Sequence, residues 1–251
     1  MFRATRFWPA AAFVFPLALF SQQPPERIAS NDNRVPGGTL RNGVLELNLE
    51  IRNGQWFPEA DDGASVMVEA FAEAGKKLST PGPLIRVAAG TEIYVTLRNT
   101  LSGRTAKVFG LEIQPSAGET PLVIEPGAIR SVRFKAGAPG TYYYWATTTD
   151  RTLGSRDDVD SQLSGAFVVD PKPPLLAAND RVFVMGLWFE PKSKVNGVEK
   201  PEREVLVING KSWPHTERFT FLVGDTVRWR WVNPTSSTHP MHLHGFYYTV
   251  T

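Results

Sequence analysis

Short segments in which apolar and polar residues alternate dominate the chain after residue 37, and they constrain the fold more than any other feature. The stretches 44–51 (VLELNLEI) and 66–71 (VMVEAF) are two of them. Because successive side chains of a strand point to opposite faces of a sheet, such alternation predicts half-buried β-strands. Glycine (21 residues) and proline (20 residues) separate the segments, and no stretch keeps a helical period. Further strands are expected at 84–87, 93–99, 107–113, 129–135, 141–147, 165–169 and 182–189.

One strand–turn–strand pattern occurs twice, at residues 86–99 (RVAAGTEIYVTLRN) and again at 220–233 (TFLVGDTVRWRWVN). The turn glycines coincide, and Asn99 coincides with Asn233. The positions expected to face inward also coincide: Ile93, Val95 and Leu97 with Val227, Trp229 and Trp231. Self-similarity at one fixed offset predicts two copies of one β-domain. The alternative is a chance match of generic strand and turn chemistry.

The domain organisation follows from this repeat and from a proline-rich break. Residues 171–178 (PKPPLLAA) interrupt the strand pattern and are expected to form a stiff linker. We therefore expect one domain at 37–170 and a second at 179–251.

Residues 1–23 are predicted to be a signal peptide. A basic start (MFRATR) precedes an unbroken apolar run at 7–20 (FWPAAAFVFPLALF). This run is short for a membrane span but typical of a secretory signal. Arg3 and Arg6 are not adjacent, so a Sec-type rather than a twin-arginine signal is expected. The protein is expected to be secreted or periplasmic; an uncleaved N-terminal anchor is the alternative.

Composition excludes several classes of site. The chain has no cysteine, which rules out disulfides, thiolate nucleophiles and iron–sulfur clusters within it. A blue-copper site also needs a thiolate, so these residues alone cannot complete one. The net charge of +2 with interspersed signs gives no indication of a nucleic-acid partner.

Three of the four histidines lie close together, in the segment 239–245 (HPMHLHG), called the histidine segment below. On an extended strand His242 and His244 would project from the same face. Pro240 breaks that strand before it and points His239 elsewhere, which predicts two metal positions rather than one. Imidazole suits copper, zinc, nickel and iron. The alternative is three surface histidines, and His215, in a separate turn, is left unassigned.

The histidine segment resembles the HPxHLHG motif of the multicopper oxidases, laccase-like proteins built from cupredoxin β-sandwiches. The stretches 80–87 (TPGPLIRV), 139–145 (PGTYYYW) and 164–170 (SGAFVVD) resemble that family's opening domain. The resemblance implies an all-β fold of tandem cupredoxin-like Greek-key β-sandwiches, the second one incomplete. It also implies copper as the cofactor, with His239 a type 1 ligand and His242 and His244 ligands of the type 2/type 3 cluster.

The first domain departs from the family at all four ligand positions. Where the family has histidines, this chain has Lys107, Phe109, Trp145 and Thr147. None of these side chains replaces imidazole at a copper site. A first domain without copper ligands is therefore expected, and whether Phe109 and Trp145 contribute to a binding surface stays open.

The resemblance implies an oxidase in which a reducing substrate passes electrons through type 1 copper to a trinuclear cluster that reduces O2 to water. The stretch 179–251 is shorter than the roughly 100 residues that a β-sandwich of this kind takes, and we expect the chain to be part of a longer protein. The remaining ligands would come from further domains or another subunit, so the chain alone is expected to be inactive. A phenol, a metal ion and nitrite stay open as substrates. The alternatives are a non-catalytic copper carrier and a structural protein with degenerate sites.

Overall fold

The computed structural model describes residues 24–112, 120–173 and 179–250, and within them the chain is almost entirely β. The expected signal peptide and residues 174–178 of the expected linker lie outside these ranges. The strands from the N-terminal part are β1 (Ala29–Ser30), β2 (Thr39–Arg41), β3 (Val44–Trp56), β4 (Val66–Glu73), β5 (Ser79–Thr80), β6 (Ile85–Ala88), β7 (Glu92–Asn99), β8 (Ala106–Phe109), β9 (Leu122–Ile124), β10 (Ile129–Lys135), β11 (Gly140–Thr147) and β12 (Ser164–Asp170). The later strands are β13 (Asn179–Glu190), β14 (Ser193–Val195), β15 (Val198–Lys200), β16 (Arg203–Ile208) and β17 (Val227–Val232). A single 3-10 turn, Leu153–Ser155, accompanies them in the described ranges.

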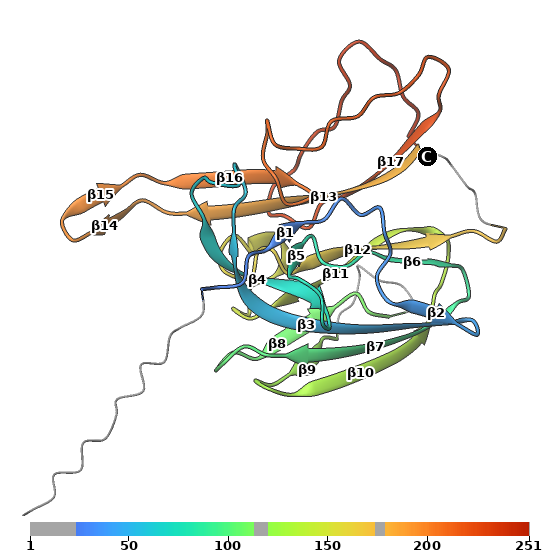
Figure 1. Cartoon of the computed structure of the whole chain (residues 1–251), viewed down its shortest axis with the longest axis horizontal. Helices are drawn as coiled ribbons and strands as arrows, with labels where there is room; N and C mark the ends of the chain where they lie inside the picture. Colours follow the sequence, from blue (N-terminus) through green and yellow to red (C-terminus); the bar gives the residue numbers. More distant parts are fainter. Residues whose placement is uncertain (1–23, 113–119, 174–178, 251) are drawn as a thin grey trace, which may run out of the picture.

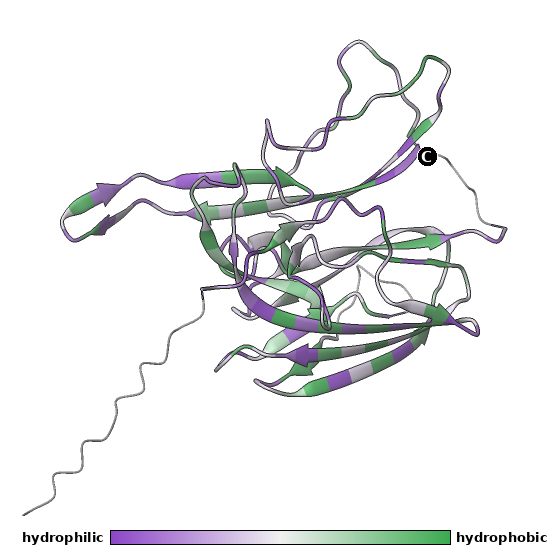
Figure 2. Ribbon diagram, viewed as in Figure 1, coloured by the Kyte–Doolittle hydropathy of each residue, from purple (hydrophilic) through white to green (hydrophobic). Residues whose placement is uncertain are grey.

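Two sheets from the N-terminal part pack face to face as a sandwich, as the sequence predicts (Figure 1). One has the order β1-β5-β4-β3-β7-β10, with β2 beside β3, and the other has the order β6-β12-β11-β8-β9. Along these strands hydrophobic and hydrophilic residues alternate (Figure 2). In β3 the alternating positions Leu45, Leu47, Leu49 and Ile51 are buried.

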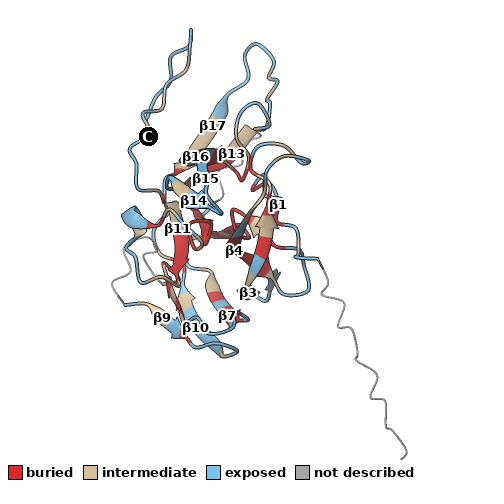
Figure 3. Ribbon diagram, turned by 90° about the vertical axis from the view of Figure 1, so that its left-hand side faces the viewer, coloured by how far each residue is buried: buried red, intermediate tan, exposed pale blue. Residues whose placement is uncertain are grey.

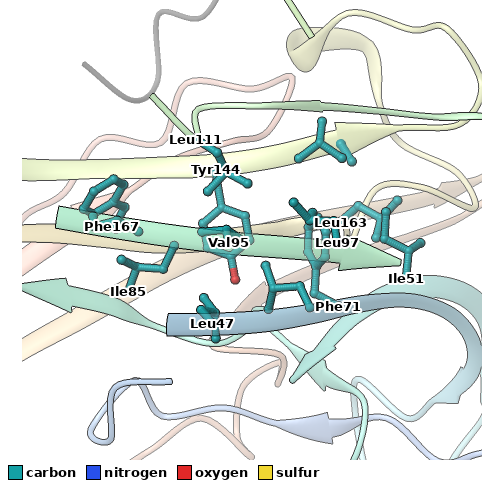
Figure 4. Close-up of a cluster of buried hydrophobic side chains, with 14 of the residues drawn as sticks. Leu47, Ile51, Phe71, Ile85, Val95, Leu97, Leu111, Tyr144, Leu163 and Phe167 are labelled. Carbon is teal, nitrogen blue, oxygen red and sulfur yellow. The ribbon is translucent and has the colours of Figure 1, made fainter. Parts of the chain in front are cut away.

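The core lies between these two sheets (Figure 4). Leu47 of β3 and Val95 of β7 meet Tyr144 of β11 and Phe167 of β12 in one buried cluster. The Tyr144 hydroxyl donates a hydrogen bond to the Pro83 carbonyl at 2.7 Å, which satisfies this buried polar group. Burial on this scale supplies most of the folding free energy of such a sandwich.

The C-terminal part forms a second sheet with the order β16-β13-β17, and a hairpin of β14 and β15. Its pairing repeats that of the first sheet: β3 lies parallel to β7 and antiparallel to β4, and β13 lies parallel to β17 and antiparallel to β16. The parallel pairs Val44–Glu92 and Asn179–Val227 have the same separation along the sequence. We call β4-β3-β7 the first-copy sheet and β16-β13-β17 the second-copy sheet.

The second-copy sheet packs with one face against the outside of the sandwich. Trp188 of β13 joins Trp56 of β3 in a buried cluster, and Val184 of β13 joins Val168 of β12 in another. In Figure 1 this sheet lies above the sandwich, and the loops that follow it rise away from both. Figure 3 shows that burial is concentrated in and near the sandwich, whereas these loops are mostly exposed.

The sequence predicts that the aromatic residues of β17 face inward and are buried. The other face of the second-copy sheet, which carries them, is not fully buried. Trp229 and Trp231 do gather on one face, with Phe183 of β13 and Phe219, around a cavity of about 140 Å³. Both tryptophans are only half-buried, and Val227 is exposed. The matching residues of the first copy, such as Val95, are completely buried because the second sheet of the sandwich covers them.

Two expected strands differ from the structure. Of the segment expected at 107–113, residue 113 lies outside the described ranges, and among residues 107–112 the strand β8 ends at Phe109. The histidine segment, expected to be extended, contains no strand and turns at His244 and Gly245. Among the described residues, no helix is long and apolar enough to span a bilayer.

Candidate metal centre

The turn that precedes the histidine segment is built by Asn233, the first residue after β17. Its side-chain Nδ2 donates to the Ser237 carbonyl at 2.9 Å, and its Oδ1 accepts from the backbone N–H of Thr235 at 3.2 Å. Asparagine commonly folds a turn in this way, because its side chain replaces a backbone partner. The turn fixes where the chain leaves the second-copy sheet.

His239 is attached to this turn. Its Nε2 lies 3.1 Å from the Thr235 hydroxyl, and the ring is half-buried. The ring therefore has a defined partner earlier in the same loop and does not join the other two histidines. The two metal positions expected from the sequence stay a prediction, and in the structure His239 stands apart from the other two histidines.

His242 and His244 face one another at the exposed end of the loop. Their Nε2 atoms are 3.2 Å apart, and the ring centroids are 4.7 Å apart at an interplanar angle of 64°. The rings meet although the segment is not a strand, and the chain turns just after them at Gly245, whose φ of 79° favours glycine. The Tyr248 hydroxyl donates to the Met241 carbonyl at 2.7 Å and closes the loop behind them.

This pair fits a metal such as copper in the chemistry and spacing of its donors. Imidazole nitrogen is a suitable ligand for copper, and both rings are accessible to an incoming ion. Two nitrogens bound to one ion at about 2.0 Å in tetrahedral geometry are about 3.3 Å apart. In the structure one Nε2–H must donate to the other Nε2, so that ring must take its second tautomer before both Nε2 atoms can bind a metal.

Within the described ranges, no three histidine, aspartate or glutamate side chains gather closely enough to hold a metal ion. The histidine segment therefore presents a pair of donors and one separate donor, not a closed site. His215 lies apart from them in a turn whose backbone N–H donates to the Ser212 carbonyl at 2.8 Å.

The four positions that lack family ligands in the first copy are brought together by β8 and β11. Phe109 lies opposite Trp145, and Lys107 lies opposite Thr147. The Phe109 and Trp145 rings stack at 4.3 Å between centroids, with 10° between their planes. Lys107 pairs instead with Asp150 at 2.7 Å. Aromatic stacking and an ion pair occupy the place where the resemblance expects imidazoles.

Thr147 is held by a buried carboxylate. Its hydroxyl donates to Asp160 Oδ2 at 2.7 Å, and the same oxygen accepts from Thr149 Oγ1 at 2.7 Å and from the Thr148 backbone N–H at 3.0 Å. Burial acts to raise the pKa of Asp160, but these hydrogen bonds and Arg156 hold it below its usual value. The Arg156 guanidinium lies 5.0 Å from the Trp145 ring, and burial lowers its pKa to about 10. Asp160 Oδ2 thus accepts several hydrogen bonds, whereas the buried Asp160 Oδ1 and the Nε and Nη2 atoms of Arg156 have no hydrogen-bond partner in the described ranges.

Sequence reasoning found the three histidines and the four substituted positions, but it missed Thr235 and Asp160. The coincidence of Asn99 and Asn233 could have indicated Thr235. Asn99 Oδ1 also accepts from the backbone N–H two positions on, at Leu101, so both copies use the same asparagine turn. Asp160 lies in a segment with no periodic pattern, and no sequence signal indicated it.

Two models of the multicopper oxidase family match this chain, at residues 74–174 and 186–251. The second match contains the whole histidine segment and the Asn233 turn. The first contains all four substituted positions. Both units that the repeat predicts are therefore similar to domains of one family.

Two curated proteins are similar in sequence. A probable nitrite reductase-hydroxylamine oxidoreductase fusion protein from Kuenenia stuttgartiensis is 30% identical over 230 residues, which cover 82% of this chain and 25% of that protein. A laccase from Bacillus subtilis (strain 168) is 48% identical over 42 residues, 17% of this chain and 8% of the laccase. The chain thus spans about a quarter or less of the curated relatives that it matches.

A solved structure described as multicopper oxidase mgLAC has the same fold. It superposes with a TM-score of 0.58 at 25% sequence identity, over 80% of this chain and 64% of its own. The similarity includes both the sandwich and part of the second unit, since it covers four fifths of the chain.

Proposed function

Because this chain belongs to the multicopper oxidase family, we propose that its histidine segment holds copper as part of a laccase-like oxidase. The observation that supports the proposal most is the His242–His244 pair, with Nε2 atoms 3.2 Å apart inside the family match. Copper is the cofactor that this family uses.

We assign His239 to a type 1 copper and His242 and His244 to the type 2/type 3 cluster, on the positions of the family motif. Copper bound there would supply one-electron transfer from a small reducing substrate and reduction of O2 to water. The chain's own residues present the imidazoles: the Asn233 turn places His239, and the hydrogen bond from Tyr248 to Met241 closes the loop that carries the pair. A phenol, a metal ion and nitrite are the candidates for the small substrate.

We propose that the remaining copper ligands come from outside this chain. The sequence has no cysteine for a type 1 site, and the four substituted positions of the first copy carry no imidazole. A further domain or another subunit would supply them. The activity is thus a property of the assembled protein, and the chain alone would be inactive.

A non-catalytic copper carrier is the second candidate. It is favoured by the accessibility of the His242–His244 pair and by the lack of a third metal-binding side chain near it in the described ranges. In this case the pair would bind and release copper without electron transfer.

Copper titration tests whether the segment binds metal at all. We expect His244→Ala to weaken copper binding at least about 10-fold, because the pair is left with one donor. His215→Ala is the matched control, since this exposed histidine lies apart from the segment, and it should bind as the unmodified chain does. Equal affinities for all three proteins would contradict the proposal.

Turnover separates the two candidates. Oxygen consumption with a phenol or a reduced metal ion, measured on the copper-loaded assembled protein, is expected for an oxidase and not for a carrier. Retention of copper without any oxygen consumption would favour the carrier.

Export is proposed as well, on the basic start and the apolar run of residues 7–20. A secreted or periplasmic location would place the copper site outside the cytoplasm. N-terminal sequencing of the mature protein tests this.

A further inference from the structure

The hydroxyl of Thr235 has a complete set of hydrogen-bond partners, which determines where its proton lies. Its oxygen is 2.7 Å from Asn233 Oδ1 and 3.3 Å from the Ser237 carbonyl oxygen. Both are acceptors without a proton to give. The hydroxyl must therefore donate its single proton to one of them, and the shorter contact favours Asn233 Oδ1.

The orientation of the Asn233 amide is fixed independently. Its Nδ2 donates to the Ser237 carbonyl at 2.9 Å, and its Oδ1 accepts from the Thr235 backbone N–H. Exchanging the two amide atoms would place two donors or two acceptors against each other at both contacts. The oxygen therefore faces Thr235.

Since the Thr235 proton is committed, its oxygen can only accept from His239. The ring atom 3.1 Å away is Nε2, so Nε2 must carry the hydrogen of the neutral imidazole. The other ring nitrogen, Nδ1, then keeps its lone pair. Metal-binding histidines are commonly fixed in this way by a partner on the nitrogen that does not bind the metal.

We infer that Thr235 is a positioning residue for copper binding by His239: it holds the ring in the Nε2–H tautomer and leaves Nδ1 as the metal donor. The inference rests on the proposed function, in which His239 is a copper ligand. It adds the residue that selects the ring tautomer.

The first copy shows what the hydroxyl adds to the turn. Asn99 makes a similar turn, with Oδ1 accepting from the Leu101 N–H at 3.0 Å and Nδ2 donating to the Arg104 carbonyl, one residue further along than in the second copy, at 2.7 Å. Leu101 stands where Thr235 stands, and it packs into the core. The asparagine turn is therefore common to both copies, whereas the hydroxyl is present only in the copy that carries histidines.

Nitrogen NMR of the neutral imidazoles tests the assignment without any metal. In the unmodified chain His239 should show a protonated Nε2 and an unprotonated Nδ1. Thr235→Val should lose this preference, because the Oγ1 acceptor is gone, and Thr235→Ser should restore it. An Nδ1–H tautomer in the unmodified chain, or the same tautomer populations in Thr235→Val, would overturn the inference.

Copper(II) added to the same samples separates this inference from the proposed function. Paramagnetic broadening of the His239 ring signals is expected at a concentration about 10-fold higher in Thr235→Val than in the unmodified chain or Thr235→Ser. The His242 and His244 signals should broaden at the same concentration in all three, which also shows that the loop remains folded. If His239 keeps the Nε2–H tautomer but never broadens, the type 1 assignment fails while the tautomer assignment holds. Equal broadening of His239 in all three would overturn the role of Thr235.

Discussion

At the scale of single residues, the two copies carry different chemistry at the positions that resemble the family's copper ligands. In the second copy His242 and His244 face each other without a further partner for their Nε2 atoms in the described ranges. In the first copy Phe109 stacks on Trp145, and Thr147 donates to Asp160. The aromatic pair fills space that a metal site would leave open, and the Thr147–Asp160 bond ties the strand to a buried carboxylate. These residues stabilise the first copy as a structural unit.

Thr147→Val should destabilise the protein at neutral pH by about 1.5–3 kcal/mol, the usual contribution of a hydrogen bond to a charged group. The Thr147 bond helps to lower the pKa of Asp160, so its contribution is present above the ordinary aspartate pKa of 3.8 and is lost as the pH falls through the lower folded-state pKa. Urea unfolding at neutral and at acid pH measures the difference.

Thr96→Val is the matched control for this prediction, because its hydroxyl faces Ser131 rather than a carboxylate. Its effect on the free energy of unfolding should not depend on pH over the same range. A Thr147→Val effect that stays constant with pH would show that the hydroxyl does not act through Asp160.

At the scale of elements, a charge network joins the second-copy sheet to the sandwich. Arg86 of β6 donates to Asp170 of β12 at 2.7 Å and to Asp180 of β13 at 2.8 Å. Arg230 of β17 donates to Asp180 at 3.0 Å and to the Thr141 hydroxyl of β11 at 3.0 Å. The hydrogen bond to Asp170 raises the pKa of Arg86, and the bond to Asp180 adds to this effect against the opposing effect of burial. The network fixes β17, and with it the start of the Asn233 turn, against the sandwich.

Arg230→Met should loosen this attachment, because Asp180 is almost fully buried and would lose one of its two guanidinium partners. We expect a loss of about 3 kcal/mol in the stability of the second-copy sheet. Hydrogen exchange should become faster in the β17 amides and stay unchanged in β7. Arg228→Met, earlier on the same strand and without an ion pair in the described ranges, should leave both unchanged; equal acceleration in the two variants would contradict a role of the network.

The strands were predictable from the sequence where one face is buried and the other is wet. The expected strands at 44–51 and 93–99 lie within β3 and β7, along which buried and less buried residues alternate. The expectation failed after Phe109, because Gly110 takes a φ of 80° and lies so close to Tyr143 that a Cβ would be 2.4 Å from its carbonyl oxygen. Tertiary contact of this kind leaves no periodic signal in the sequence.

At the scale of the whole molecule, the chain is a repeated sheet used in two ways. The inward face of the first-copy sheet is covered by β6, β8, β11 and β12, whereas the equivalent face of the second-copy sheet carries half-buried Trp229 and Trp231. The repeat itself was predictable from its glycine and asparagine positions. The packing of Trp188 against Trp56 was not, because the run 182–189 (VFVMGLWF) is apolar at almost every position and does not show which face meets the sandwich.

The candidate site was predictable as a set of residues but not as a geometry. The motif indicated His239, His242 and His244, and the spacing indicated that His239 lies apart from the other two. The tautomer of His239 and the loop that brings the pair together depend on hydrogen bonds from Thr235 and Tyr248, which no spacing encodes. The central claim is that this loop binds copper through imidazole.

Pulsed electron paramagnetic resonance of the copper(II)-loaded chain tests that claim most directly, because it detects the nitrogens of coordinated imidazole. The unmodified chain and His215→Ala should show the same imidazole couplings, and His242→Ala/His244→Ala should lose those of the pair. Unchanged couplings in the double variant, or their loss in His215→Ala, would show that the copper binds elsewhere and contradict the account.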